Sequence, residues 1–351
     1  MSTTDAGRLP AWLNRQLVDL MHHPAHALLL RGPSGLGQYE LGLALASAWL
    51  CLEPGPSGAC GRCSSCHGIA VRTHADLCVL MPESLSLQHG WPLDEKLQAE
   101  LEGGKRKPSN EIKVDAARDA VSFTQLSRSG GTTKVVLVYP AERMNAITAN
   151  TLLKTLEEPT GAVRFILASE AADRLLPTLR SRCQTHTLAW PDEGEALAWL
   201  AEQAALGQPS GRVDLEHLRV LLAASGGRPA DAWAMMEQGG AKQAAEGWRA
   251  LPQALARGQV SALSDLSPAR AIGALQKVCH DLWCIRLGAA PRYFQAADLP
   301  ARSASTPGSL YLLSAWSREL AAQARHAEHP FNAGLLFEAL VSRAQQVLRK
   351  A

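Results

Sequence analysis

The sequence lacks both the long apolar segments of a membrane protein and the leader of a secreted one. No apolar run reaches the roughly 18 residues that a membrane-spanning helix needs. Residues 1–10 contain no charged stretch followed by an apolar one, so we expect no secretory signal and a cytoplasmic location. Glycine and proline together make up about one residue in seven, which is too few for a fibrous or disordered chain and predicts a globular one.

The chain also lacks a charge excess of either sign. Its 351 residues include 35 Lys and Arg against 33 Asp and Glu, a formal net charge of +2, and only 5% of them are aromatic. Proteins that bind nucleic acid alone usually carry a basic face, often with interleaved aromatic side chains. We therefore expect any DNA contact to be local or shared with protein partners. The length predicts two or three domains.

Cysteine is scarce except in one cluster. Eight cysteines are too few for a disulfide scaffold in a chain of this length, but Cys51, Cys60, Cys63 and Cys66 fall within 16 residues. Two-residue spacings let a tight turn direct thiolates at one tetrahedral Zn²⁺, and four thiolates leave no coordination position open. The cluster therefore predicts a structural zinc ion.

Alternatives to this ligand set remain open. His67 or His74 could replace Cys51 as the fourth ligand, and the four thiols could also be reduced without a metal. We expect the cysteines outside the cluster, Cys183 among them, to be packed as small apolar residues.

The first half of the chain alternates short apolar segments with helical patterns. Strands are predicted at residues 27–30, 77–81, 134–139, 164–169 and 185–189, and a helix at 144–158 with Ile147, Leu152, Leu153 and Leu156 on its apolar face. Strands that are apolar at successive positions are typical of a parallel sheet covered on both faces, so this half predicts an α/β fold with a five-stranded parallel sheet. The polar segment 83–110 is predicted to be a loop or an excursion from the sheet-and-helix pattern.

The second half predicts helices only. They are expected at residues 194–206, 215–224 and 229–237, followed after a break at Gly239-Gly240 by a helical tail with an apolar stripe from Ile272 to Ile285. The final helix, capped by Asn332, carries Leu335 and Leu340 on its apolar face. We predict three domains: 1–189 with the zinc module at about 51–66, 190–239, and 240–351.

A glycine-rich loop follows the first strand. Gly32, Gly35 and Gly37 match the phosphate-binding pattern G-x-x-x-x-G-K-[ST] between a strand and a helix. The pattern then fails, because Gln38 stands where a lysine contacts the phosphates and Tyr39 where a small hydroxyl binds Mg²⁺.

The strand at 134–139 shows a third departure. An acidic pair that holds metal and activates water should follow its apolar run, but the sequence continues Tyr139-Pro140-Ala141-Glu142. We predict a nucleotide site that has lost its chemistry, with no nucleotide expected to bind. A glycine-rich turn of other origin and a weak, non-hydrolysing site both remain open.

Two further segments carry a family resemblance. Residues 150–159, Asn-Thr-Leu-Leu-Lys-Thr-Leu-Glu-Glu-Pro, and the triplet Ser181-Arg182-Cys183 resemble the signatures of AAA+ clamp-loader subunits. Together with the cysteine module after the loop helix, they make the chain similar to the delta-prime family of bacterial DNA polymerase III clamp-loader subunits. The similarity extends weakly to the tail at 329–332. Thr151 stands where the family usually has alanine.

The resemblance implies a fold and an assembly. The fold would be an AAA+ RecA-like sheet with a zinc insertion, a small helical lid and an all-α collar domain. The assembly would be a heteropentamer with tau/gamma and delta subunits, in which ATP is bound by neighbouring subunits. Arg182, flanked by Ser181 and Cys183, would be an arginine finger that reaches the γ-phosphate on a tau/gamma subunit.

The resemblance also implies a function. The chain would be a non-hydrolysing stator that supports ATP-driven loading of the sliding clamp onto primer-template DNA, as part of the polymerase holoenzyme. A P-loop ATPase that is competent with non-standard residues is the main alternative, and a zinc-dependent DNA-binding protein is a third. Lys154 and Glu157 are expected to form a solvated pair three residues apart on one helix.

Overall fold

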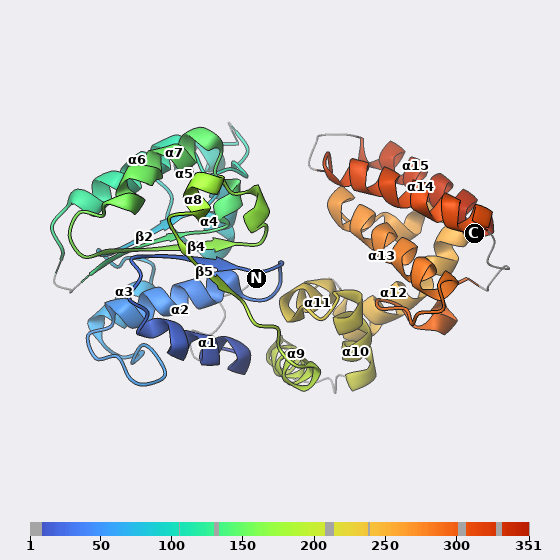
Figure 1. Ribbon diagram of the computed structural model, residues 1–351, viewed down its shortest axis with the longest axis horizontal. Helices are drawn as coiled ribbons and strands as arrows, with labels where there is room; N and C mark the ends of the chain where they lie inside the picture. Colours follow the sequence, from blue (N-terminus) through green and yellow to red (C-terminus); the bar gives the residue numbers. More distant parts are fainter. Residues whose placement is uncertain are drawn as a thin grey trace. The chain divides into compact units, whose positions relative to one another are not determined.

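The chain divides into two compact units, Met1–Pro191 and Asp192–Ala351, in the computed structural model (Figure 1). The structure describes residues 9–104, 106–129, 133–207, 214–237, 239–300, 307–327 and 332–350. Most of the tail motif at 329–332 lies outside these residues. Within the described residues, no helix combines the length and apolarity that crossing a lipid bilayer requires.

The first unit is built on a five-stranded parallel sheet. Its strands are β1 (Ala27–Arg31), β2 (Leu77–Leu80), β3 (Lys134–Val138), β4 (Val163–Ser169) and β5 (Gln184–Thr187). Their order across the sheet is β2-β3-β4-β1-β5, and every neighbouring pair is parallel. The predicted strands and the parallel α/β sheet are confirmed. β3 is buried at all five positions, because helices cover both faces of the sheet.

Helices pack on the two faces of this sheet (Figure 1). Those of the first unit are α1 (Ala11–Met21), α2 (Gln38–Leu50), α3 (Ser64–Ala70), α4 (Glu83–His89), α5 (Glu95–Glu102), α6 (Val114–Gln125), α7 (Ala146–Glu157) and α8 (Pro177–Arg180), with 3₁₀ turns η1 (Ala141–Arg143) and η2 (Ala172–Arg174). α2 lies so close to the sheet that a Cβ on Gly42 would approach Leu137 to 2.9 Å. On the other face, Leu152 and Leu156 of α7 pack against Phe165 and its neighbours.

The apolar face of α7 differs from the prediction at its start. Leu152 and Leu156 are buried as expected, but Ile147 is 69% exposed. The inward position in the first turn belongs to Thr148, whose hydroxyl donates to the carbonyl oxygen of Ile112, so Ile147 is turned towards solvent. Asn145 caps the helix by accepting a hydrogen bond from the Thr148 amide.

The segment 83–110 is an excursion rather than a plain loop, because it contains α4 and α5, which were not predicted. Glu83, at the start of α4, holds the segment together by pairing with Arg106 at 2.6 Å and Lys113 at 2.8 Å and by accepting the Ser109 amide at 2.9 Å. Burial alone would raise the pKa of Glu83, but these three partners lower it to about 2. The partners of Glu83 lie up to 30 residues away, which no local pattern reveals.

Helices are the only regular secondary structure in the described residues of the second unit. It contains α9 (Glu193–Gly207), α10 (Leu215–Ala224), α11 (Pro229–Met236), α12 (Gly240–Ala256), α13 (Pro268–Arg286), α14 (Pro307–Ala324) and α15 (Ala333–Lys350), with η3 (Val260–Leu263) and η4 (Ala296–Asp298). Its core includes Trp316 of α14 and Leu340 of α15. Asn332 caps α15 as predicted, with its Oδ1 3.0 Å from the Gly334 amide. Leu335 was expected on the buried face but is 65% exposed, because it lies in the first turn at the edge of the packing.

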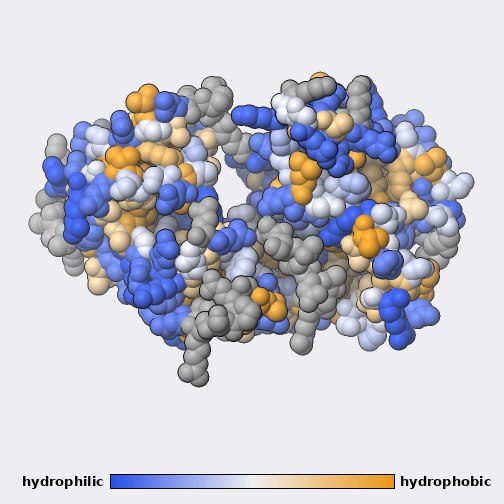
Figure 2. All heavy atoms as spheres, turned by 180° about the vertical axis from the view of Figure 1, so that it is seen from behind, coloured by the Kyte–Doolittle hydropathy of each residue, from blue (hydrophilic) through white to orange (hydrophobic). Residues whose placement is uncertain are grey.

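The coloured part of the face that Figure 2 shows is mainly hydrophilic. On the face that Figure 2 shows, hydrophobic side chains gather in small groups between charged and polar ones. Single exposed apolar residues, such as Leu52 and Leu126 at 58% and 65% exposure, are common on soluble folds.

Candidate functional site

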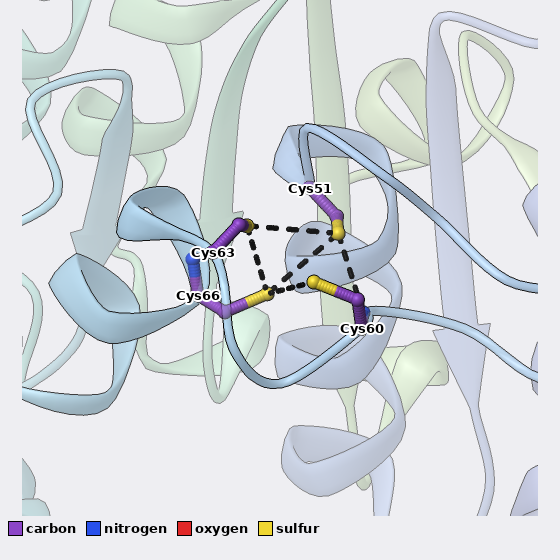
Figure 3. A group of neighbouring side chains, drawn as sticks. All are labelled: Cys51, Cys60, Cys63 and Cys66. Atoms are coloured by element: carbon purple, nitrogen blue, oxygen red, sulfur yellow. Dashed lines mark hydrogen bonds between the residues drawn. The ribbon is translucent and has the colours of Figure 1, made fainter.

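The four clustered cysteines converge on one point (Figure 3). Cys51 ends α2, Cys60 lies in the following loop, Cys63 caps α3 and Cys66 lies in its first turn. The Sγ–Sγ distances are 3.8 Å for Cys51–Cys63, 3.9 Å for Cys60–Cys66, 3.5 Å for Cys63–Cys66 and 3.7 Å for Cys66–Cys51. A disulfide would bring two of these sulfurs to about 2 Å, so the thiols are separate.

These distances fit a tetrahedral zinc site. Four sulfurs at about 2.3 Å from Zn²⁺ lie about 3.8 Å from one another, which is the spacing found here. Backbone N–H groups also point at two of the sulfurs, from Cys60 to Cys51 at 3.3 Å and from Cys66 to Cys63 at 3.5 Å. Such amides stabilise thiolates, and those of Cys66 and Leu52 lower the pKa of Cys63 to about 6. The donor set, its spacing and its amides therefore suit Zn²⁺.

The two histidines near the cluster are engaged elsewhere or exposed. His74 Nε2 lies 2.7 Å from the Ser65 hydroxyl, and its Nδ1 accepts the Asp76 amide at 3.1 Å. The Ser65 hydroxyl donates in turn to the carbonyl oxygen of Leu50 at 2.6 Å, so this chain of contacts fixes α3 against the end of α2. His67 is exposed on α3. The geometry favours Cys51 as the fourth ligand.

The glycine-rich loop keeps the backbone shape of a phosphate site. Gly35 and Gly37 have φ values of 76° and 99°, which favour glycine, and Gly37 begins α2. A Cβ on Gly37 would lie 2.5 Å from the end of the Leu13 side chain, so a larger residue would force that side chain of α1 to move. The loop lies at the carboxyl end of β1, which is where ligands bind in open parallel sheets.

The side chain of Gln38 fills the inside of the glycine-rich loop. This side chain is buried, and Nε2 donates to the carbonyl oxygens of Gly32 at 2.6 Å and Pro33 at 2.7 Å. A lysine in this position extends its charge towards the phosphates of a nucleotide. Here the amide is neutral and both of its N–H groups are bonded to the loop, so it offers no donor to a phosphate.

Aromatic side chains surround Tyr39, at the position where a small hydroxyl would bind Mg²⁺. Tyr39 is 5% exposed and accepts a hydrogen bond from Trp91 Nε1 at 2.7 Å. The rings of His89 and Tyr139 lie 4.3 Å and 5.3 Å from its ring, and burial together with the Arg72 charge lowers the pKa of His89 to about 4. We call Tyr39, His89, Trp91 and Tyr139 the aromatic cluster. His89 and Trp91 were not expected here, since nothing in the sequence links them to Tyr39.

The carboxylates near the end of β3 are bonded to protein groups. Tyr139 follows β3, and its hydroxyl donates to Glu170 at 2.8 Å. Glu142 accepts hydrogen bonds from the Ser169 hydroxyl at 2.8 Å and from the Glu170 amide at 3.1 Å. These hydrogen bonds hold both carboxylates against protein groups.

Arg182 lies after α8, outside this loop region. Its Nη1 donates to the carbonyl oxygen of Thr178 at 2.8 Å, while Nε and Nη2 both contact Oε1 of Glu157. Glu157 therefore pairs with Arg182, whereas the sequence suggested a pair with Lys154 on its own helix. The Ser181 hydroxyl donates to the same Thr178 oxygen at 3.1 Å. Cys183 is buried in the core, and burial raises the pKa of its thiol to about 11, which suits a packing role.

The sheet order and the loop after β1 define a class of protein. The first unit is an AAA+-like P-loop domain in which the residues that bind phosphate and metal are replaced and a cysteine module follows the loop helix. Residues 14–192, about half of the chain, match the protein-family model described as DNA polymerase III, delta subunit. The chain belongs to this family.

Curated relatives and a solved structure were also found. DNA polymerase III subunit delta' of Pseudomonas aeruginosa is 40% identical over 222 residues, which cover 63% of this chain and 59% of that protein. The subunit delta' of Escherichia coli K12 is 36% identical over 213 residues, 60% of this chain and 54% of that protein. The chain thus spans less than two thirds of the length of these relatives. A DNA polymerase III gamma-subunit-related protein from Thermotoga maritima aligns over 96% of this chain and 100% of that one, with 15% identity and a TM-score of 0.45.

Proposed function

We propose that this chain is a non-hydrolysing subunit of a DNA polymerase III clamp loader. In this role it acts as a stator that supports ATP-driven loading of a sliding clamp onto primer-template DNA. The observation that carries the proposal is the Gln38 amide bonded to the carbonyl oxygens of Gly32 and Pro33 in a member of this family. A phosphate-binding loop whose carbonyl oxygens are bonded to the Gln38 side chain suits a subunit that retains the fold of an ATPase but does not hydrolyse ATP.

The neighbouring residues support the loss of hydrolysis independently. Phosphoryl transfer depends on Mg²⁺ and on charges placed around the phosphates. Tyr39 and Tyr139 fill the metal position with aromatic rings, and Glu142 is held by Ser169 and Glu170. Restoring Gln38 alone to lysine would leave these groups in place.

The rest of the proposal concerns assembly. The subunit would join tau/gamma and delta subunits in a heteropentamer, with residues 190–239 as a small helical lid and 240–351 as a collar domain. Arg182 would be an arginine finger for ATP on a neighbouring tau/gamma subunit, since a planar, permanently charged fork suits a phosphate in a dry interface. The near-neutral charge of the chain supports a role in which protein partners, rather than this chain alone, hold the DNA.

The cysteine module would hold a structural Zn²⁺ through Cys51, Cys60, Cys63 and Cys66. Four thiolates complete the coordination shell, so the ion would stabilise the fold without binding a substrate. The Ser65 hydroxyl, which donates to the carbonyl oxygen of Leu50, fixes α3 against the end of α2 and gives the module a rigid base at the opposite end of α2 from the glycine-rich loop.

Nucleotide binding to the isolated chain tests the loss of the ATP site. We expect no Mg²⁺-dependent ATP binding at concentrations up to about 1 mM, the upper end of common enzyme affinities, because Gln38 and the aromatic cluster occupy the phosphate and metal positions. Equilibrium dialysis with labelled ATP measures this, with a tau/gamma subunit as the positive control. The variant Gln38→Lys should also fail to bind ATP, since Tyr39 and Tyr139 remain in place. Micromolar affinity with turnover would establish the competent ATPase instead.

A further inference from the structure

Glu157 lies where a helix normally avoids a carboxylate. It is the last residue of α7, and the partial negative charge at a helix C-terminus repels an anion. No arginine or lysine of the last turn is bonded to its Oε1; the contact comes from Arg182, 25 residues further along the chain. An acidic residue at this end is therefore stabilised by its pairing with Arg182.

The pairing uses one edge of the guanidinium. An arginine side chain has five N–H donors. Nε and one N–H of Nη2 face Oε1 of Glu157, and one N–H of Nη1 is donated to the Thr178 carbonyl oxygen. One N–H then remains on each terminal nitrogen. Two such donors on a planar fork match the two oxygens of a phosphate or carboxylate.

The pair lies at the surface, where it can meet another molecule. The side chains of Arg182 and Glu157 are 31% and 45% exposed. An unpaired arginine there would sample many rotamers and would have to be ordered each time a phosphate is bound. Glu157 and the Thr178 carbonyl oxygen order it beforehand.

We infer that Glu157 is the positioning residue for Arg182, holding the guanidinium by one edge so that the other is presented to an oxyanion on a partner. The inference rests on the proposed function, in which that oxyanion is the γ-phosphate of ATP on the neighbouring subunit. Glu157 itself touches no phosphate and acts through Arg182.

Substitution of Glu157 in the reconstituted loader tests the inference. We expect Glu157→Ala to lower turnover at the neighbouring ATP site by roughly 10- to 100-fold, as misplacement of a catalytic group does, with the KM for ATP unchanged because the partner binds the nucleotide. Glu157→Gln should lose less, since its amide oxygen still accepts hydrogen bonds. Glu158→Ala is the matched control: it removes the same charge from the next residue, which is also exposed, and should leave turnover unchanged.

A double variant separates positioning from a general effect on folding. If Glu157 acts through Arg182, Glu157→Ala should lower turnover in the wild-type chain and change nothing further in an Arg182→Ala chain. Native mass measurement confirms that each variant assembles, and Glu157→Gln carries the test if the alanine variant does not assemble.

Three results would contradict the inference, and they are distinguishable. If Arg182→Ala lowers turnover but Glu157→Ala behaves like Glu158→Ala, positioning fails while the arginine finger stands. A further loss in the Arg182→Ala background would show that Glu157 acts by another route. If Arg182→Ala itself leaves turnover unchanged, the arginine finger of the proposed function fails and the role of Glu157 falls with it.

Discussion

Replacing Arg182 with alanine is expected to lower ATP turnover at the neighbouring subunit by about 10³-fold or more, the contribution that arginine fingers make in trans. In the proposed function, the physical reason is the loss of a permanent charge that would neutralise the phosphate in the transition state. Rapid-quench hydrolysis by the reconstituted loader measures this effect. The fraction of the pre-steady-state burst of ATP hydrolysis that comes from the neighbouring site should disappear. The fractions that come from the other ATP sites should remain.

Two matched variants control this experiment. Arg180→Ala removes an exposed arginine two residues earlier, on α8, and should leave the burst intact. Arg182→Lys keeps the charge but loses the planar fork, so most of the loss should remain. A full burst from Arg182→Ala in an assembled complex would refute the arginine finger.

Loss of one cluster thiol is expected to abolish zinc binding and unfold the cysteine module. In Cys66→Ser the buried sulfur that lies within 3.9 Å of the other three cysteines is lost. Structural zinc sites contribute about 10–16 kcal/mol of apparent binding free energy in small peptides. The module buries few apolar side chains of its own, Ile69 among them, so we expect its folding to depend on the ion.

Metal content and hydrogen exchange measure the outcome. Wild-type protein should hold one zinc per chain, and Cys66→Ser should hold none. Amide exchange in α3 should become at least 100-fold faster, while β3 and β4 stay protected by the sheet core. Cys284→Ser, which removes a thiol from α13, should keep both zinc and protection. Zinc at one per chain in Cys66→Ser, or unchanged exchange in α3, would contradict the metal centre.

Local patterns were sufficient to predict the sheet and the cysteine cluster. β3 is apolar at successive positions because both its faces are covered, and the spacing of Cys60, Cys63 and Cys66 by itself restricts how their sulfurs can meet. In both cases the residues that determine the structure are neighbours in sequence.

The contacts that surround Gln38 and Tyr39 could not be predicted in this way. The substitutions Gln38 and Tyr39 were visible, but Trp91 reaches Tyr39 across 52 residues of chain. The helices α4 and α5 were missed for a similar reason, because the ion pairs of Glu83 that order their segment are long-range. Glu157 was expected to pair with Lys154 within its own helix, and its contact with Arg182 depends on how α7 and α8 pack.

The measurement that tests the central claim most directly is native mass spectrometry of this chain mixed with tau/gamma and delta subunits and a slowly hydrolysed ATP analogue. We predict one defined heteropentamer that contains a single copy of this chain and as many bound nucleotides as tau/gamma subunits. Two results would contradict the account. One is a complex in which the ratio of this chain to the other subunits is not fixed, and the other is a complex that holds an additional nucleotide bound to this chain.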